Sequence, residues 1–186
     1  MVGSVAPVGH ASTVEVVALH TSPLHAYEGR PGDGPLPDPD GGSRERIEIR
    51  AGLGVVGDRY FGRPAHRTAS VTLLAVESLQ HVAAELGLPA VPDPLLTRRN
   101  VVLRGFAVDD LPRDTEFTLD SGDGAVRFRA HRPANPCSWM DVVLAPGALR
   151  ALRRRGGVRC EPLSNGFLQV GPAELVLAEG GAELGA

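Results

Sequence analysis

The sequence contains no lysine, although 19 arginines are present among its 186 residues. Without lysine the chain cannot form the Schiff base that anchors pyridoxal phosphate, so no covalent pyridoxal phosphate is expected. There are only two cysteines, Cys137 and Cys160, which are too few for the disulfide scaffold of a small secreted protein. No Cys-x-x-Cys pair and no histidine cluster has the spacing of a zinc site, so both cysteines are expected to be free thiols.

Long apolar runs are also missing, and no segment approaches the length that spans a membrane. Residues 1–13 lack the basic region and the apolar core of a secretory signal. With 22 acidic residues against 19 basic ones, the net charge of -3 provides no global field for nucleic acid or an anionic membrane. These absences predict a cytoplasmic protein with neither nucleic acid nor membrane among its partners, in which any anion site is local.

What the sequence does contain is a series of short apolar segments separated by turns, with 23 glycines and 16 prolines. This pattern predicts a mainly β fold, an antiparallel or mixed β-barrel with a few peripheral helices. One domain is expected over residues 14–178, with flexible termini at 1–13 and 179–186. Strands are expected at 14–20, 45–50, 71–75, 100–104, 116–119, 125–130, 158–163, 167–170 and 173–178. Helices are expected at 76–88, from residue 138 and around 146–153.

Turn residues add two hairpins to this picture. Residues 121–124 (SGDG) separate two apolar runs, and Asn165-Gly166 is the strongest hairpin signal in the chain. Residues 28–43 are rich in glycine, proline and aspartate, which is typical of a surface loop. Residues 51–70 hold too many glycines and arginines for regular structure, and a long irregular stretch of this kind is usually functional or disordered.

Cys137 is the candidate for chemistry. Ser138 and Asp141 form a loose capping box, so the cysteine is expected just outside a helix N-terminus, where the backbone favours an anionic thiolate. The nearby Arg132 favours the same ionised form. The alternative is a small buried core cysteine, and that alternative is the one adopted for Cys160, which stands in an apolar strand with nothing arranged around it.

Two arginine-containing segments are candidates for binding: residues 54–59 (GVVGDR) and 97–100 (TRRN). Arginine forks bind phosphate or carboxylate, and the amide of Asn100 offers both a donor and an acceptor to a heterocycle edge. Together the two segments suit an anionic, nitrogen-rich ligand. The alternatives are an ion-paired turn and a solvated pair of arginines. The run at 153–155 is interpreted as an exposed helix end.

The order of these motifs resembles the MOSC (molybdenum cofactor sulfurase C-terminal) domain family, in its stand-alone bacterial type, over nearly the whole chain. The residues that carry the resemblance are Gly54, Gly57, Asp58, Arg59, Arg98, Arg99, Asn100, Pro136, Cys137, Met140, Gly156 and Gly157. The resemblance implies a pyruvate-kinase-barrel-like β-barrel and a single cysteine that carries sulfur or ligates the molybdenum of the pterin cofactor. In that arrangement Cys137 is the metal ligand and is catalytic together with Asp58, which would orient an arginine or a metal-bound group. The residues expected to contact the cofactor are Arg59, Arg98, Arg99, Asn100 and Met140.

The chain departs from the family pattern at two places. Many stand-alone relatives carry C-x-P-C before the methionine, whereas here the first cysteine is replaced by Ala134, so a mechanism that needs two neighbouring thiols is excluded. The Gly-Asp of the last hairpin is replaced by Gly171-Pro172, which is expected to weaken the turn that closes the barrel.

Three functions follow as expectations. The first is a molybdenum-dependent oxidoreductase that reduces N-hydroxylated small molecules with electrons from a separate reductase, because the sequence has no flavin, haem or iron–sulfur motif. The second is a sulfur carrier that receives a persulfide from a separate cysteine desulfurase. The third is a barrel that binds a small ligand without catalysis. The first two need the same thiolate in the same surroundings, so the sequence leaves them open.

Overall fold

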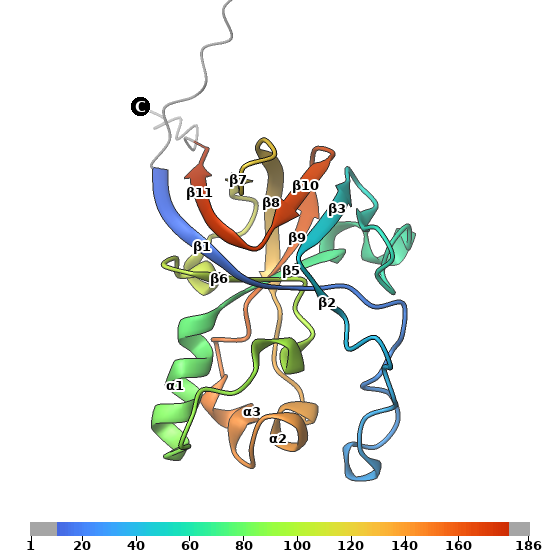
Figure 1. Cartoon of the computed structure of the whole chain (residues 1–186), viewed down its shortest axis with the longest axis vertical. Coiled ribbons are helices and arrows are strands. Elements are labelled where there is room, and N and C mark those ends of the chain that lie inside the picture. The colour runs from blue at the N-terminus through green and yellow to red at the C-terminus, as the bar shows by residue number, and fades with distance from the viewer. Residues whose placement is uncertain (1–10, 179–186) are drawn as a thin grey trace, which may run out of the picture.

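Seven strands form a closed barrel at the centre of the fold (Figure 1). In the computed structural model, which describes residues 11–178, they follow the order β11-β7-β8-β9-β5-β6-β1, and β1 pairs back with β11. All neighbours are antiparallel except β5 and β6. The mainly β fold predicted from the sequence is therefore confirmed. The barrel strands are β1 (Ala11–His20), β5 (Val71–Ala75), β6 (Val101–Arg104), β7 (Glu116–Asp120), β8 (Val126–Pro133), β9 (Val158–Pro162) and β11 (Gly171–Leu177).

Smaller elements surround the barrel. The strand β2 (Ser43–Arg44) extends the sheet beside β1, and a second sheet consists of β10 (Gly166–Gln169), β3 (Arg46–Arg50) and β4 (Gly54–Val55). The α-helices are α1 (Val76–Leu86), α2 (Trp139–Val143) and α3 (Ala148–Ala151), and they gather beyond one end of the barrel (Figure 1). Four 3-10 helices are η1 (Pro31–Asp33), η2 (Pro64–Ala69), η3 (Pro94–Thr97) and η4 (Val108–Asp110). None of the helices within residues 11–178 has the length and apolarity needed to cross a membrane.

Because apolar and polar residues alternate along the strands, the apolar side chains lie inside the barrel and fill it. Phe117 and Phe128 face each other in register on β7 and β8, with ring centroids 5.4 Å apart. All five residues of β5 are buried, because one face lies in the barrel and the other is covered by helices. A second apolar cluster joins the helices and includes Val82, Trp139 and Met140. This cluster fixes α2, and with it the residues just before α2, against α1.

Several predicted elements are confirmed. The strand β5 has the predicted bounds, α1 ends at Gly87 in the left-handed conformation, and β7 and β8 form the predicted hairpin. The predicted flexible N-terminal segment is wrong for residues 11–13, because they pair with β11 as part of β1. The rest of the predicted termini, residues 1–10 and 179–186, lies outside the described residues.

The predicted hairpin at Asn165-Gly166 is wrong. Both edges of β9 are already paired, with β5 and with β8, so β10 pairs with β3 in the second sheet instead. Asn165 serves a different contact, because its Oδ1 accepts a hydrogen bond of 2.8 Å from the backbone nitrogen of Ala51. The expected weakness at Gly171-Pro172 does not open the barrel either, since β11 pairs with β1 over six residue pairs that include Pro172 and Glu15.

Candidate functional site

Cys137 lies in the turn between β8 and α2, and its side chain is exposed. The predicted helix begins two residues later, at Trp139, but the predicted capping box is wrong. Ser138 makes no capping bond, while Oδ1 of Asp141 accepts bonds from the backbone nitrogens of Gly147 (3.1 Å) and Leu149 (2.7 Å) at the start of α3. Because α2 has only five residues, its dipole is a weak source of stabilisation for a thiolate.

The turn that follows β4 positions Arg59 through a buried carboxylate. Asp58 has no exposed side-chain surface, and its oxygens accept hydrogen bonds from the backbone nitrogen of Tyr60 (3.0 Å) and from Nδ2 of Asn100 (3.1 Å). The same carboxylate lies 3.5 Å from Nη1 of Arg59. The Arg59 guanidinium also lies over the ring of Tyr60, at 4.8 Å from its centroid. Asp58 therefore holds an arginine in place from inside the protein.

Asn100 is 2% exposed, and its amide is fully engaged by the protein. Its Oδ1 accepts bonds from the backbone nitrogen (2.9 Å) and the hydroxyl (3.0 Å) of Thr72, and its Nδ2 donates to the carbonyl of His20 (3.2 Å) as well as to Asp58. An amide with all these partners has no free donor for a ligand. Asn100 instead ties the Asp58 turn to β1 and β5, so the expected contact with a heterocycle is at odds with its position.

Arg98 and Arg99 point in different directions, because Arg98 adopts the left-handed conformation with φ 53°. Arg98 donates to Oδ2 of Asp38 (2.8 Å) and to the carbonyl of Leu24 (2.7 Å), both in the long connection after β1. Arg99 donates to the carbonyls of Gly156 (3.0 Å) and Ala134 (2.7 Å), and Ala134 stands three residues before Cys137. Arg98 therefore binds the long connection after β1, whereas Arg99 binds the segment that leads to Cys137.

Arg99 and Arg159 lie within electrostatic reach of Cys137. Burial, reinforced by Arg159, lowers the pKa of Arg99 to about 10, and Cys137 opposes this shift. Burial is also the main cause that lowers the pKa of Arg159, which is opposed by Tyr60 and Cys137 and reinforced by Arg132 and Arg59. Both guanidinium groups remain charged at neutral pH.

Sequence reasoning missed Arg159, although a signal for it was present. In the run Val158-Arg159-Cys160, strand alternation places the arginine on the opposite face from its two buried neighbours. Arg159 pairs in register with Arg132 across the β8–β9 ladder, at an irregularity in the strand. Two like charges opposite each other repel, which makes an anion between them favourable.

We call Arg59, Arg99, Arg132 and Arg159 the arginine cluster, because Arg59 and Arg132 lie within electrostatic reach of Arg159, and Arg99 and Arg159 also lie within reach of the exposed Cys137. Among the described residues, Arg99, Arg132 and Arg159 form no salt bridge, and Asp58 is the carboxylate partner of Arg59. An excess of guanidinium charge of this kind binds phosphate or carboxylate groups. The site is therefore equipped for an anionic ligand beside a sulfur nucleophile.

A resident metal would find one protein donor here. Within residues 11–178 no group of three or more His, Cys, Asp or Glu side chains is placed to hold a metal ion. A metal at Cys137 would therefore have to bring its other ligands with it, as the metal of an organic cofactor does, and a thiolate is a soft donor that suits such a metal. Met140, predicted to contact the cofactor, is 4% exposed and packs in the helix cluster, so its contacts are internal.

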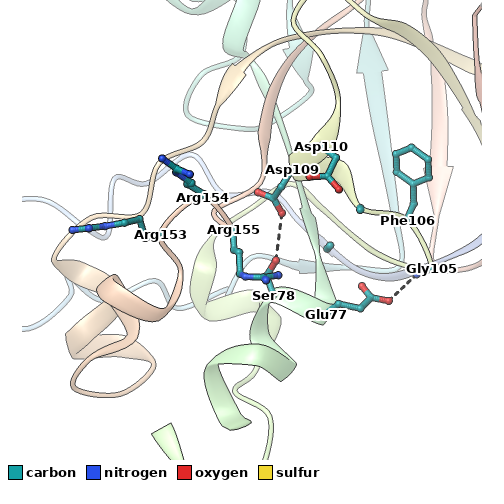
Figure 2. Close-up of a pocket in the computed structure, with 11 residues that line it drawn as sticks. Glu77, Ser78, Gly105, Phe106, Asp109, Asp110, Arg153, Arg154 and Arg155 are labelled. Atoms are coloured by element: carbon teal, nitrogen blue, oxygen red, sulfur yellow. Dashed lines mark hydrogen bonds between the residues drawn. The ribbon is translucent and has the colours of Figure 1, made fainter. Parts of the chain in front are cut away.

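A separate hollow of about 560 Å³ lies between the start of α1, the segment before β7 and the arginines at 153–155. Figure 2 shows its acidic wall, where Asp109 lies 3.4 Å from Oγ of Ser78 and Glu77 accepts a 2.9 Å bond from the backbone nitrogen of Gly105. Arg153 and Arg154 extend away from this wall. The three arginines are exposed, as the sequence predicted. The residues that line this hollow include no cysteine, and Arg155 lies within electrostatic reach of Asp109.

The family model described as "MOSC domain" matches residues 56–173, well over half of the chain. The chain therefore belongs to the MOSC domain family, in agreement with the resemblance found in its motifs. No curated protein sequence matches it significantly.

Two solved structures are similar to the fold. The YUAD protein from Bacillus subtilis aligns with a TM-score of 0.71 at 16% identity, covering 92% of this chain and 99% of that protein. YiiM from Escherichia coli aligns with a TM-score of 0.56 at 16% identity, covering 90% of this chain and 70% of YiiM. At these identities the likeness concerns the fold alone.

Proposed function

We propose that the protein binds the molybdenum cofactor through Cys137 and reduces N-hydroxylated small molecules with electrons from a separate reductase. Membership of the MOSC family supports a domain of the molybdenum-cofactor-sulfurase type. The observation that carries the proposal is the exposed thiol within electrostatic reach of Arg99 and Arg159, in a cluster in which three of four guanidinium groups have no carboxylate partner among residues 11–178. A cytoplasmic location belongs to the proposal, because a reducing compartment would keep Cys137 as a thiol.

The residues of the site suit the parts of such a cofactor. The Cys137 sulfur supplies a soft ligand for molybdenum, and Arg59, Arg99 and Arg159 suit the phosphate of the pterin. Asp58 and Asn100 position Arg59 from the interior, while Arg98 holds the connection after β1. When bound, the molybdenum centre supplies two-electron chemistry. In the overall reaction an N–OH group takes up two electrons and two protons, its N–O bond breaks, and an amine and water are formed.

The test is an assay of the chain purified from a host that makes the cofactor. Reduced methyl viologen serves as the electron donor and N-phenylhydroxylamine as the substrate, and the product amine is measured. We expect reduction by the wild type and a loss of at least about 100-fold in Cys137→Ser, with Cys160→Ala as the matched control that keeps the activity. Equal rates for wild type and Cys137→Ser would refute the oxidoreductase proposal.

A sulfur-carrier role is the second candidate, and the exposure of Cys137 favours it. A persulfide is an anion at neutral pH, and the guanidinium groups of the arginine cluster would stabilise that negative charge. Incubation with a cysteine desulfurase and cysteine, followed by intact-mass measurement, should add one sulfur atom to the wild type and none to Cys137→Ser. Failure of both this test and the reduction assay would leave a barrel that binds a small ligand without catalysis.

A further inference from the structure

A hollow of about 470 Å³ lies beside the segment that leads to Cys137. It is lined by Asn135 and Pro136 of that segment and by three arginines of α3 and the turn after it. The α3 patch is our name for these three arginines, Arg150, Arg153 and Arg154. The segment before Cys137 and the α3 patch therefore share one hollow, although α2 separates them in the sequence.

Tight backbone packing holds the turn after α3 against the segment before Cys137. Arg99 donates to the carbonyls of Gly156 (3.0 Å) and Ala134 (2.7 Å) and so ties the two together. The backbone nitrogen of Ala134 donates in turn to the carbonyl of Gly157 (2.8 Å). A Cβ atom added at Gly156 would lie only 2.3 Å from the carbonyl oxygen of Ala134, so the two backbones are in direct contact. A molecule bound to the α3 patch would therefore lie close to Cys137.

The positive charges of the α3 patch have no partner within residues 11–178. All three side chains are exposed, and none of them forms a salt bridge there. The carboxylate that lines the same hollow, Asp141, is already engaged by the backbone nitrogens of Gly147 and Leu149. Figure 2 shows that Arg153 and Arg154 extend away from the acidic wall of the neighbouring hollow. Three guanidinium groups are therefore free to bind carboxylates of another molecule.

We propose that the α3 patch is the docking surface for an acidic protein, which it holds beside Cys137. In the proposed function this protein is the separate reductase, and the docking surface rests on that function for the partner's role alone. A compact group of positive charges complements a compact group of carboxylates on a folded protein, which speeds the encounter and fixes its register. Nucleic acids and anionic membranes spread their charge widely. The net charge of -3 and the carboxylates of Asp109 and Asp110 in the neighbouring hollow would repel them.

The test measures docking through the rate at which Cys137 reacts, on the full chain produced in a host that lacks the molybdenum cofactor. The probes are a glutamate-rich peptide with one cysteine, activated as its pyridyl disulfide, and a matched peptide with glutamine in place of glutamate. Attack by Cys137 joins the peptide to the chain through a new disulfide and releases pyridinethione, whose absorbance gives the rate. Peptide mapping confirms the modified residue. The readout needs no reduction of a substrate, so failure of docking and failure of the proposed function are told apart.

The wild type should react with the glutamate peptide at least about tenfold faster than with the glutamine peptide at low ionic strength. The ratio should fall toward one at about 1 M salt, where charges are screened. The triple variant of the α3 patch should lower the low-salt ratio by about fivefold or more. Its three substitutions are Arg150→Gln, Arg153→Gln and Arg154→Gln.

The control removes the same charge from three exposed arginines that already have carboxylate partners. Its three substitutions are Arg46→Gln, Arg50→Gln and Arg127→Gln. Because the net charge and the arginine cluster are the same in both triple variants, only the α3 patch distinguishes them. The control should keep the ratio of the wild type to within about twofold.

Three results would overturn the proposal. The first is a wild type that reacts equally fast with both peptides at low ionic strength, and the second is the same ratio in the two triple variants. The third is binding to phosphatidylglycerol vesicles or to a single-stranded oligonucleotide that the α3 patch variant loses and the control keeps, which would assign the patch to a lipid or a nucleic acid. If circular dichroism shows the α3 patch variant to be unfolded, Arg153→Gln alone must lower the ratio for the proposal to stand.

Discussion

Cys137 and Cys160 carry the same functional group in opposite surroundings. Cys160 is fully buried in β9 among the apolar side chains of the barrel, and burial raises the pKa of its thiol. Cys137 is exposed in the turn after β8, within electrostatic reach of Arg99 and Arg159. The comparison teaches that the neighbours decide the chemistry of a cysteine, because the strand alternation that buries Cys160 places Arg159 on the opposite face of β9, within electrostatic reach of Cys137.

The largest expected difference between the two cysteines is in thiol reactivity. In the native protein one thiol should react rapidly with a disulfide reagent, and the second should react at least about 100-fold more slowly, because it needs local or global unfolding. Cys137→Ser should remove the fast phase, and Cys160→Ala should keep it. Absorbance of the released thiolate measures both phases, and two fast thiols in the wild type would erase the distinction.

The buried polar residues Asn100, Thr72 and Asp58 should contribute more to the stability of the fold than the exposed Cys137 does. Asn100→Ala removes the amide that bonds to Thr72, His20 and Asp58 and leaves the buried Asp58 carboxylate short of a donor. We expect a loss of about 3 to 5 kcal/mol in the free energy of unfolding, measured by urea denaturation. Asn135→Ala, at an exposed asparagine near Cys137, is the control and should cost less than about 0.5 kcal/mol. Similar losses for both variants would show that Asn100 does not anchor the site.

His20, whose backbone carbonyl accepts a hydrogen bond from Asn100, should make the free energy of unfolding depend on pH. Burial, followed by the charges of Arg98 and Arg59, lowers the pKa of His20 from 6.5 to about 3. The folded imidazole is therefore neutral where the unfolded one binds a proton, so this contribution to stability is complete above pH 6.5 and is lost as the pH falls toward 3. The free energy of unfolding should decline by up to about 1.4 kcal/mol per pH unit below pH 6.

The variant His20→Gln isolates this effect, since it keeps a polar side chain that does not titrate. Denaturation curves recorded between pH 7 and pH 4 should show a flatter decline in the variant than in the wild type. Parallel declines in the two proteins would mean that other groups cause the acid sensitivity.

The smallest expected effect concerns serine in place of each cysteine. Cys160→Ser introduces a hydroxyl into the apolar barrel and should cost about 1 to 3 kcal/mol of stability. Cys137→Ser changes an exposed side chain and should cost less than about 0.5 kcal/mol. Urea denaturation of the two variants makes this comparison directly, and an equal cost would contradict the assignment of Cys160 to the core.

Much of the fold was predictable from local pattern. The apolar run of β5, the helical spacing of α1 and the turn between β7 and β8 each contain their own signal. The failure of the hairpin at Asn165-Gly166 could not be predicted, because a turn signal does not tell whether the strand before it still has an unpaired edge. Both edges of β9 are already paired. The capping box failed for a related reason, since Asp141 finds donors at the start of α3 that only the folded chain brings near.

The candidate site was predictable in part. Motif order pointed to Cys137, Asp58 and Arg59, and strand alternation could have added Arg159. Asn100 looked like a ligand contact because its type suits one, yet its burial depends on β1, β5 and the Asp58 turn meeting in space.

The most direct test of the central claim is the molybdenum content of the wild type, Cys137→Ser and Cys160→Ala, all purified from one host that makes the cofactor. We expect about one molybdenum atom per chain in the wild type and in Cys160→Ala, and almost none in Cys137→Ser, because Cys137 is the soft donor that the site supplies. A wild type without molybdenum, or a Cys137→Ser variant that retains it, would contradict the proposal.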